Sequence, residues 1–183
     1  MTHLKAIAEL EKEVEAGNHQ IMKIKESGGL ATTGGWILNF GEDTIVFQEP
    51  KDWSGSVLGD YPPQIDVKTS AKFTHQGDDG SMGAVVYVGP RKKGGSTECA
   101  WVFAWYTPGN GNANKTYVEV GPAEDYPKGN IDRWEIIKAN LLNAPGHTSH
   151  AIDNVKTGAE ASSSIKPGYT SVATSVFDVV KIK

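Results

Sequence analysis

The sequence predicts a mainly β protein, an antiparallel β-sandwich flanked by two α-helices. Its 183 residues include 21 glycines, five tryptophans and six tyrosines, a composition that suits turn-rich sheets better than a helical bundle. From residue 34 onward, short apolar runs alternate with Gly, Pro, Asn and Asp, and few helical stretches separate them. Strands at this spacing are typical of antiparallel sandwiches, and one domain over residues 1–183 is long enough to bury a full core.

The clearest strands form a long hairpin. Residues 83–89 and 101–108 are rich in Val, Phe, Tyr and Trp, and a polar segment at 90–95 joins them. Because side chains alternate along a strand, the odd positions of the second run carry Trp, Phe and Trp on one face. The even positions, which end at Tyr106, share the other face. We expect one face to lie in the core and the other to be offered to a ligand or a membrane.

The other strands are predicted from the same pattern within a sandwich that spans residues 34–183. We expect strands near residues 34–40, 43–48, 63–75, 83–89, 98–107, 115–120 and 170–182. The segment from residue 143 to 168 is polar and built of small side chains. We therefore expect long loops there, or a weak strand around residues 151–155.

Two helices are expected beside the sheets. Over residues 1–26, apolar side chains recur at near-helical spacing among several glutamates, which predicts an amphipathic helix. A second helix is predicted near residues 131–142, where Asp132 and Glu135 match a capping box. The N-terminal helix packs on the body, mediates self-association as a homo-oligomer, or detaches to enter a bilayer surface. Its glutamates and its lack of Trp and Phe argue against the last of these, because anionic headgroups repel carboxylates.

Composition excludes several classes of partner. With 22 acidic against 18 basic residues, the net charge of −4 provides no general attraction for nucleic acid or anionic lipid. Cys99 is the single cysteine, so no intramolecular disulfide can form. The first residues lead into a charged amphipathic segment rather than a long apolar run. We therefore expect a cytosolic protein, or one released without a signal peptide, that acts at a membrane surface.

Motifs for catalysis, metals and cofactors are missing from the sequence. Residues 94–97 lack the lysine and the spacing of a phosphate-binding loop, and no nucleophile elbow of the form Gly-x-Ser-x-Gly occurs. His147 and His150, with Asp153 nearby, resemble a metal-ligand spacing, but no Cys pair or motif carboxylate accompanies them. We therefore expect solvent-exposed loop histidines, and a protein that is not an enzyme and needs no cofactor or metal.

Aromatic residues between the predicted strands favour a binding role. Trp53 stands in a polar segment, and Tyr61 follows in the same connection. Trp and Tyr combine an apolar body with a polar tip, which suits membrane–water boundaries and sugar faces. The alternative for Trp53 is that it tucks under its own loop. Trp36 and Trp134 lie on apolar faces of their segments, so we expect both in the core.

Five short segments, taken in order, resemble a known family. They are residues 61–63 (Tyr-Pro-Pro), 71–75 (Ala-Lys-Phe-Thr-His), 83–87 (Gly-Ala-Val-Val-Tyr), 103–108 (Phe-Ala-Trp-Tyr-Thr-Pro) and 114–117 (Asn-Lys-Thr-Tyr). The combination resembles plant jasmonate-induced proteins, is similar to Nakanori-like mushroom proteins, and is more remotely similar to the sea-anemone actinoporins. The resemblance covers residues 34–140 and 175–183 and implies an actinoporin-like β-sandwich flanked by two helices.

The resemblance also implies a ligand class. Nakanori-like proteins bind sphingomyelin with cholesterol, actinoporins bind sphingomyelin and make pores, and fungal lectins of similar fold bind glycans. Carried over residue by residue, the actinoporin headgroup pocket maps to Thr74, Tyr106, Pro108 and Tyr117. Aromatic faces would hold the choline cation, while the threonine and tyrosine hydroxyls would meet the phosphate.

One segment departs from the actinoporin pattern. After the proline, actinoporins carry an aromatic-rich membrane loop, whereas residues 109–114 here are Gly-Asn-Gly-Asn-Ala-Asn. This polar loop weakens the case for deep insertion and suits hydrogen bonding to a sugar or a headgroup.

These features lead to three hypotheses. The first is a non-enzymatic module that recognises sphingomyelin-type headgroups in cholesterol-containing membranes, with cytolysis as a weaker extension. Its main ligand-binding residues would be Trp53, Tyr61, Tyr106 and Tyr117. The second is a lectin on the same fold that uses an aromatic platform with Asn110, Asn112 and Asn114. The third is an intracellular stress-induced or storage protein without a small ligand.

Overall fold

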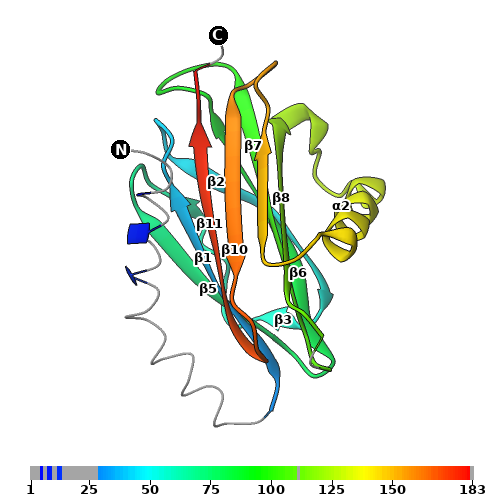
Figure 1. Ribbon diagram of the computed structural model, residues 1–183. Coiled ribbons are helices and arrows are strands. Elements are labelled where there is room, and N and C mark those ends of the chain that lie inside the picture. The colour runs from blue at the N-terminus through cyan, green and yellow to red at the C-terminus, as the bar shows by residue number, and fades with distance from the viewer. Residues whose placement is uncertain (1–4, 6–7, 10–11, 14–28, 111, 182–183) are drawn as a thin grey trace.

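The computed structural model describes residues 5, 8–9, 12–13, 29–110 and 112–181, which form a two-layered β-sandwich with one complete α-helix, α2 (Ile131–Asn143), outside it (Figure 1). The strands of the first sheet are β1 (Ala31–Asn39), β3 (Ser56–Val57), β5 (Ser70–Gly77), β9 (Thr148–Ile152), β10 (Ala159–Ile165) and β11 (Thr170–Val179). Those of the second are β2 (Ile45–Ser54), β4 (Gln64–Ile65), β6 (Gly80–Pro90), β7 (Glu98–Pro108) and β8 (Lys115–Pro122), followed by the short 3-10 helix η1 (Ala123–Asp125). The six-stranded sheet has the order β3-β5-β1-β11-β10-β9, and the five-stranded sheet has the order β4-β2-β6-β7-β8.

The predicted hairpin is confirmed as β6 and β7, which pair along their whole length from Gly80 opposite Pro108 to Pro90 opposite Glu98. The odd positions of β7 face the six-stranded sheet and form the centre of the core. There Trp101 stacks on Phe177 of β11, with ring centroids 6.1 Å apart. Burial of such large rings dominates the hydrophobic free energy of a domain of this size.

The even positions of β7 are covered by α2. Trp134, Ile137 and Leu141 are the buried side chains of the helix, and they pack on a cluster that includes Val102 and Ala104. The second face of the hairpin is therefore largely buried in a second core beneath α2. Only the part that the helix does not cover lies near the surface. Trp134 lies in this core, as expected.

The cap of α2 differs from the predicted one. The side chain of Asn130 caps the helix, because its Oδ1 accepts a hydrogen bond from the backbone N–H of Arg133 at 3.1 Å. The expected capping box of Asp132 and Glu135 is wrong by two positions, since Asp132 already lies in the first turn.

The expectation of a purely antiparallel sandwich is wrong at one pair. β1 and β11 are parallel, from Thr32 opposite Thr170 to Asn39 opposite Phe177. Parallel strands need a crossover between them, and here the crossover contains all the other strands. Figure 1 shows the blue β1 and the red β11 side by side in the middle of the sheet.

Two strands lie where long loops or one weak strand around residues 151–155 were expected, and β9 overlaps that weak strand. β9 and β10 both fall between residues 143 and 168, and β10 pairs with β9 on one side and β11 on the other. The inward positions of β10 are Ala159, Ala161, Ser163 and Ile165. These inward positions recur at every second residue of the sequence, as in other strands. Most of them are Ala or Ser, which have low β-propensity, so the pattern predicted a strand only weakly.

Two predicted strand boundaries also change. The strand expected over residues 63–75 is divided into β4 and β5 by a turn in which Lys68 has a φ of 59°. β2 extends to Ser54, so that Trp53 lies in a strand rather than in a loop. Pro50 is tolerated in β2 because β4 pairs only with residues 45 and 46, which leaves that side of the strand open.

The outer face of the six-stranded sheet holds Trp36, which was expected in the core. Its ring is only partly buried and packs against Val172 and Val176 of β11. Lys72 Nζ lies 5.7 Å from its ring centroid. Trp36 is therefore a surface-side aromatic on the face opposite to α2.

The predicted N-terminal helix over residues 1–26 falls almost wholly outside the described residues. Lys5, Ala8, Glu9, Lys12 and Glu13 are described, and their backbone is helical. Glu13 Oε2 accepts a hydrogen bond from the hydroxyl of Ser70 in β5 at 3.0 Å. Within the described residues, no helix has both the length and the apolar character needed to cross a bilayer.

Candidate functional site

Four half-buried side chains gather on the outer face of the five-stranded sheet, beside α2. They are Trp53, Met82, Tyr106 and Tyr117, and all pack against the cluster beneath the helix. Met82 stands opposite Tyr106, and Tyr117 stands opposite Ala104, two positions before Tyr106. We call these four residues the aromatic surface. Three of them were predicted from the sequence, while Met82 was missed, although its pairing opposite the even positions of β7 places it on the same face.

A β-bulge places Trp53 on the aromatic surface. The pairing of β2 with β6 shifts between Asp52 and Ser54, so the residue between them changes its direction. The ring of Trp53 meets Trp134 of α2 edge-on, with centroids 6.1 Å apart. Its indole Nε1 is buried and has no hydrogen-bond partner among the described residues.

The hydroxyl of Tyr117 is held by side chains that fix α2 to the sheet. It donates a hydrogen bond to Glu119 Oε2 at 2.7 Å and accepts one from Asn140 Nδ2 at 3.1 Å. Burial, and then the negative charge of Glu119, raise the pKa of Tyr117 far above its usual value, so the hydroxyl stays protonated. Tyr117 therefore offers a ligand its ring rather than its hydroxyl.

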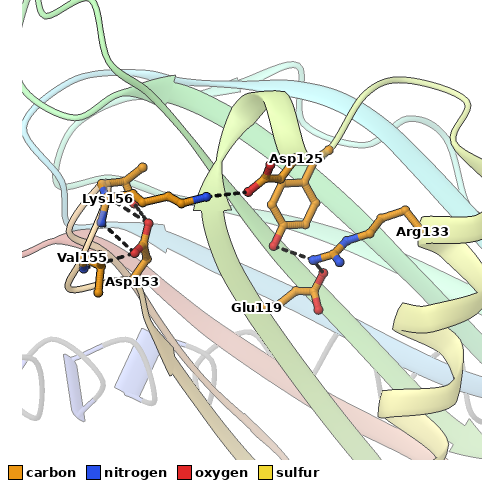
Figure 2. Close-up of polar contacts among 8 residues, drawn as sticks. Glu119, Asp125, Arg133, Asp153, Val155 and Lys156 are labelled. Carbon is orange, nitrogen blue, oxygen red and sulfur yellow. Dashed lines mark hydrogen bonds and ion pairs between the residues drawn. The ribbon is translucent and has the colours of Figure 1, made fainter.

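Arg133 anchors the first turn of α2 to the same glutamate. Its Nη2 lies 2.6 Å from Glu119 Oε1 and 3.0 Å from the hydroxyl of Tyr126. The guanidinium carbon also lies 4.6 Å from the centroid of the Tyr126 ring. Figure 2 shows Arg133 reaching from the helix toward Glu119 on β8. The anchor keeps the helix in place beside the aromatic surface.

Tyr61, a predicted ligand residue, lies inside the sandwich. Its side chain is 7% exposed, and its ring stacks on Phe47 at 5.7 Å and meets Phe73 edge-on at 5.1 Å. The hydroxyl donates to Asp52 Oδ1 at 2.9 Å. The structure does not place Tyr61 on the aromatic surface.

Thr74 lies on the opposite outer face of the molecule from Tyr106. Its neighbours Phe73 and His75 in β5 are both buried between the sheets, so Thr74 points outward from the six-stranded sheet. Tyr106 alternates in the same way with the buried Trp105 and points outward from the five-stranded sheet. The structure therefore does not assemble the headgroup pocket implied by the actinoporin resemblance.

The β7–β8 loop continues from the end of β7 next to the aromatic surface. Pro108 is buried opposite Gly80, whereas Asn110 and Asn112 are exposed. The backbone N–H of Asn112 donates to Asn110 Oδ1 at 3.1 Å. Asn114, by contrast, is buried and donates through Nδ2 to the carbonyls of residues 166 and 168 at 2.7 and 2.9 Å. Asn114 thus ties the loop to the β10–β11 turn and leaves two asparagines for a ligand.

A buried polar network, which the sequence analysis missed, joins the two sheets. Nδ1 of His75 lies 2.8 Å from the Ser81 hydroxyl, and Nε2 makes a close polar contact of 3.3 Å with Asp52 Oδ1. The Ser81 hydroxyl also lies 2.8 Å from that of Thr33. The order Asp-His-Ser resembles a nucleophilic triad, but Ser81 and His75 have no exposed surface, so a substrate cannot reach them.

His147 and His150 are both exposed, as expected, but His150 lies in β9 rather than in a loop. His150 Nε2 lies 2.8 Å from Glu160 Oε1. Asp153 instead caps its own turn, and its carboxylate accepts hydrogen bonds from the backbone N–H groups of Val155 and Lys156 (Figure 2). Burial alone would raise the pKa of Asp153, but these bonds, together with those from Thr157, hold it below its usual value. Within the described ranges, no three His, Cys, Asp or Glu side chains are arranged to hold a metal ion.

Comparison with solved structures identifies the fold. The lipid-binding protein Nakanori matches with a TM-score of 0.72 and 16% identity, over 94% of this chain and 85% of that protein. A lectin from Xerocomus chrysenteron matches with a TM-score of 0.48 and 11% identity, over 80% of this chain and 97% of the lectin. The first likeness shows the same fold, as the sequence resemblance implied.

Comparison with known sequences identifies the family. No family model matches the chain. A jasmonate-induced protein homolog from Atriplex canescens is 36% identical over 141 residues, which are 74% of this chain and 70% of the relative. Identity at that level over most of both chains confirms the family that the sequence resemblance indicated. The chain belongs to the family of jasmonate-induced protein homologs and has the fold of Nakanori.

Proposed function

We propose that the protein is a non-enzymatic recognition module that binds the choline-type headgroup of sphingomyelin in cholesterol-containing membranes. The observation that carries this proposal is the aromatic surface, where Trp53, Met82 and Tyr106 remain partly open on one outward face. Aromatic faces attract a quaternary ammonium group through cation–π interaction, and a methionine adapts to its shape. The fold shared with a lipid-binding protein supports the same ligand class.

The surroundings of the aromatic surface suit a lipid headgroup. Lys115 stands opposite Tyr106, and its Nζ donates to the carbonyl of Leu142 at the end of α2. Lys115 and the Tyr106 hydroxyl would meet the phosphate, while the side chain of Leu142, which is 40% exposed, would touch the acyl boundary. Thr74 has no part in this proposal, because it lies on the other face.

Co-sedimentation with vesicles tests the proposal. Wild-type protein should pellet most strongly with vesicles of sphingomyelin and cholesterol and more weakly with phosphatidylcholine and cholesterol, because both lipids present the choline group that the aromatic surface would hold. Trapped dye in both vesicles tests cytolysis separately, and the polar β7–β8 loop leads us to expect little release. Pelleting on neither vesicle would contradict recognition of the choline-type headgroup, and equal pelleting on both would contradict the preference for sphingomyelin.

Substitution of Tyr106 tests the assignment of the site. Tyr106→Ala should weaken vesicle binding about tenfold, since a desolvated cation–π contact contributes on the order of 1–2 kcal/mol. Its thermal midpoint should stay within about 2 °C of wild type if the residue serves a ligand rather than the core. Tyr169→Ala is the matched control, because Tyr169 is 50% exposed and precedes β11 in the other sheet. An equal loss in both variants would indicate general interfacial contact and not a headgroup site.

A further inference from the structure

The outer face of the six-stranded sheet contains a cavity of about 440 Å³ over β9, β10 and β11. It lies on the opposite side of the sandwich from the aromatic surface. Its lining residues are Thr148, Ser149, His150, Ser162, Ser163, Ser164, Thr174 and Val176. Its volume lies within the range of ordinary small-molecule sites.

The cavity follows from the side chains that β10 presents outward. Ser162 and Ser164 stand on the outer face, whereas the inward positions of this strand are buried. Ser162 is opposite His150 on one side and Val176 on the other. Small serines between larger neighbours leave a hollow along the middle strand, and no loop is needed to form it.

Hydroxyl groups dominate the walls of the cavity. The Ser164 hydroxyl lies 2.8 Å from that of Thr174, which orients both. The hydroxyls of Ser162 and Thr148 have no side-chain hydrogen bond within the part of the chain that the structure describes. Each hydroxyl can donate one hydrogen bond and accept two, so this wall has capacity left for a polar ligand.

The charge of the cavity selects against ionic ligands. No Lys or Arg is among the described lining residues, and the imidazole of His150 already contacts the carboxylate of Glu160 at 2.8 Å. An anion would therefore lack a cationic partner. A cation would have to compete with His150 for Glu160. A neutral ligand with several hydroxyl groups fits these walls best.

A partly buried aromatic side chain lies beside the cavity. Val176 is 1% exposed, and Trp36 of β1 packs against it. Trp36 also stands beside Thr174 in the parallel β1–β11 register. A pyranose has one apolar C–H face and a rim of hydroxyls, so its C–H face can lie toward the partly exposed Trp36 while its rim meets Thr148, Ser162 and Ser164.

We propose that this hydroxyl-lined cavity is a second ligand site that binds a neutral saccharide. It is separate from the headgroup site on the other sheet and does not depend on it. It is also separate from the exposed asparagines of the β7–β8 loop.

Ligand-observed NMR with full-length protein tests the proposal. The probes are methyl glycosides of glucose, galactose, mannose and N-acetylglucosamine, with glycerol 3-phosphate as an anionic comparison. At least one glycoside should show saturation transfer, and its titration should change the tryptophan fluorescence through Trp36. Absence of transfer for all four glycosides at millimolar concentration would overturn the proposal.

Two variants locate the site. Ser162→Phe places a ring in the hollow and should weaken glycoside binding at least tenfold. Thr170→Val on the same face of β11 is the control, because Thr170 lies outside the cavity lining, and it should bind like wild type. The thermal midpoint and near-ultraviolet circular dichroism of Ser162→Phe should match those of wild type, which shows that the variant is folded. Glycoside binding that survives in a folded Ser162→Phe would place the sugar elsewhere and overturn the assignment.

Discussion

At the scale of single residues, the contact between Asp52 and His75 explains how a polar group is tolerated between the sheets. His75 is fully buried and meets the Trp105 ring edge-on at 5.4 Å. Asp52 lies at the edge of the buried network, and 30% of its side chain is exposed. Burial alone would raise the pKa of Asp52, but the contacts with His75 and Tyr61 outweigh that effect and hold it below its ordinary value of 3.8.

This carboxylate should make stability depend on pH on the acid side. Because the pKa is lower in the folded than in the unfolded state, the stabilisation is fully present above the unfolded pKa, and it is lost as pH falls through the folded pKa. Asp52→Asn should therefore reduce the free energy of unfolding at pH 7 by about 1–3 kcal/mol, because a buried imidazole loses a charged partner. It should also flatten the decline in stability below about pH 4, the usual carboxyl range.

Urea unfolding at several pH values measures both effects. Asp60→Asn is the control, because Asp60 is exposed and makes no hydrogen bond or ion pair with this network among the described residues. An acid decline in Asp52→Asn as steep as in wild type would show that the carboxylate is not linked to folding.

At the scale of elements, α2 is joined to the sheet by both apolar and charged contacts. Its buried side chains supply the hydrophobic part, while Arg133 and Glu119 form a pair whose side chains are 30% and 12% exposed. A partly buried pair of this kind contributes little over an apolar pair, but removing one partner leaves the other charge unpaired.

Single and double substitutions should therefore differ at this anchor. Arg133→Met should lower the free energy of unfolding by about 2–3 kcal/mol, because Glu119 remains charged and shielded. The double variant Arg133→Met with Glu119→Gln should recover part of that loss. Chemical denaturation of Arg133→Met, of Glu119→Gln and of the double variant gives the coupling energy between the two side chains. Simple additivity would contradict the role of the pair.

The elements also differ in how well the sequence predicted them. β6, β7 and α2 carry large apolar side chains at periods of two and 3.6, so their existence and faces could be predicted. β10 consists of Ala, Glu and Ser with one Ile, and β9 has a single large apolar residue, Ile152, so both gave weak strand signals. Trp53 was placed in a loop because a bulge in a strand gives no periodic signal. Thr74 and Tyr106 could be placed on strands but not on sheets, because pairing between distant segments decides which outer face each one occupies. The aromatic surface was thus predicted in part, and the hydroxyl-lined cavity was not.

At the scale of the whole molecule, the sandwich has two outer faces with different chemistry. One carries the aromatic surface beside α2, and the other carries the hydroxyl-lined cavity over β9, β10 and β11. The packed core between the sheets separates them, and interiors of this density move little on ligand binding.

The two proposed ligands should therefore bind independently. The affinity for a glycoside should be the same, within about twofold, for free protein and for protein bound to sphingomyelin–cholesterol vesicles, since sites without a coupling free energy do not influence each other. Glycoside titration in the presence and absence of vesicles measures this. Competition between the two would mean that both ligands use one surface.

The parallel pairing of β1 with β11 has a consequence for biosynthesis. During translation, β1 is synthesised before both of its neighbours in the sheet. One edge of β1 can pair with β5, but the other edge stays unpaired until β11 has been synthesised. β10 and β9 can form a hairpin on their own, but they reach the rest of their sheet only through β11. The layer that carries the hydroxyl-lined cavity therefore closes only after β11 has been synthesised. Contacts so distant along the chain favour folding in milliseconds to seconds rather than microseconds.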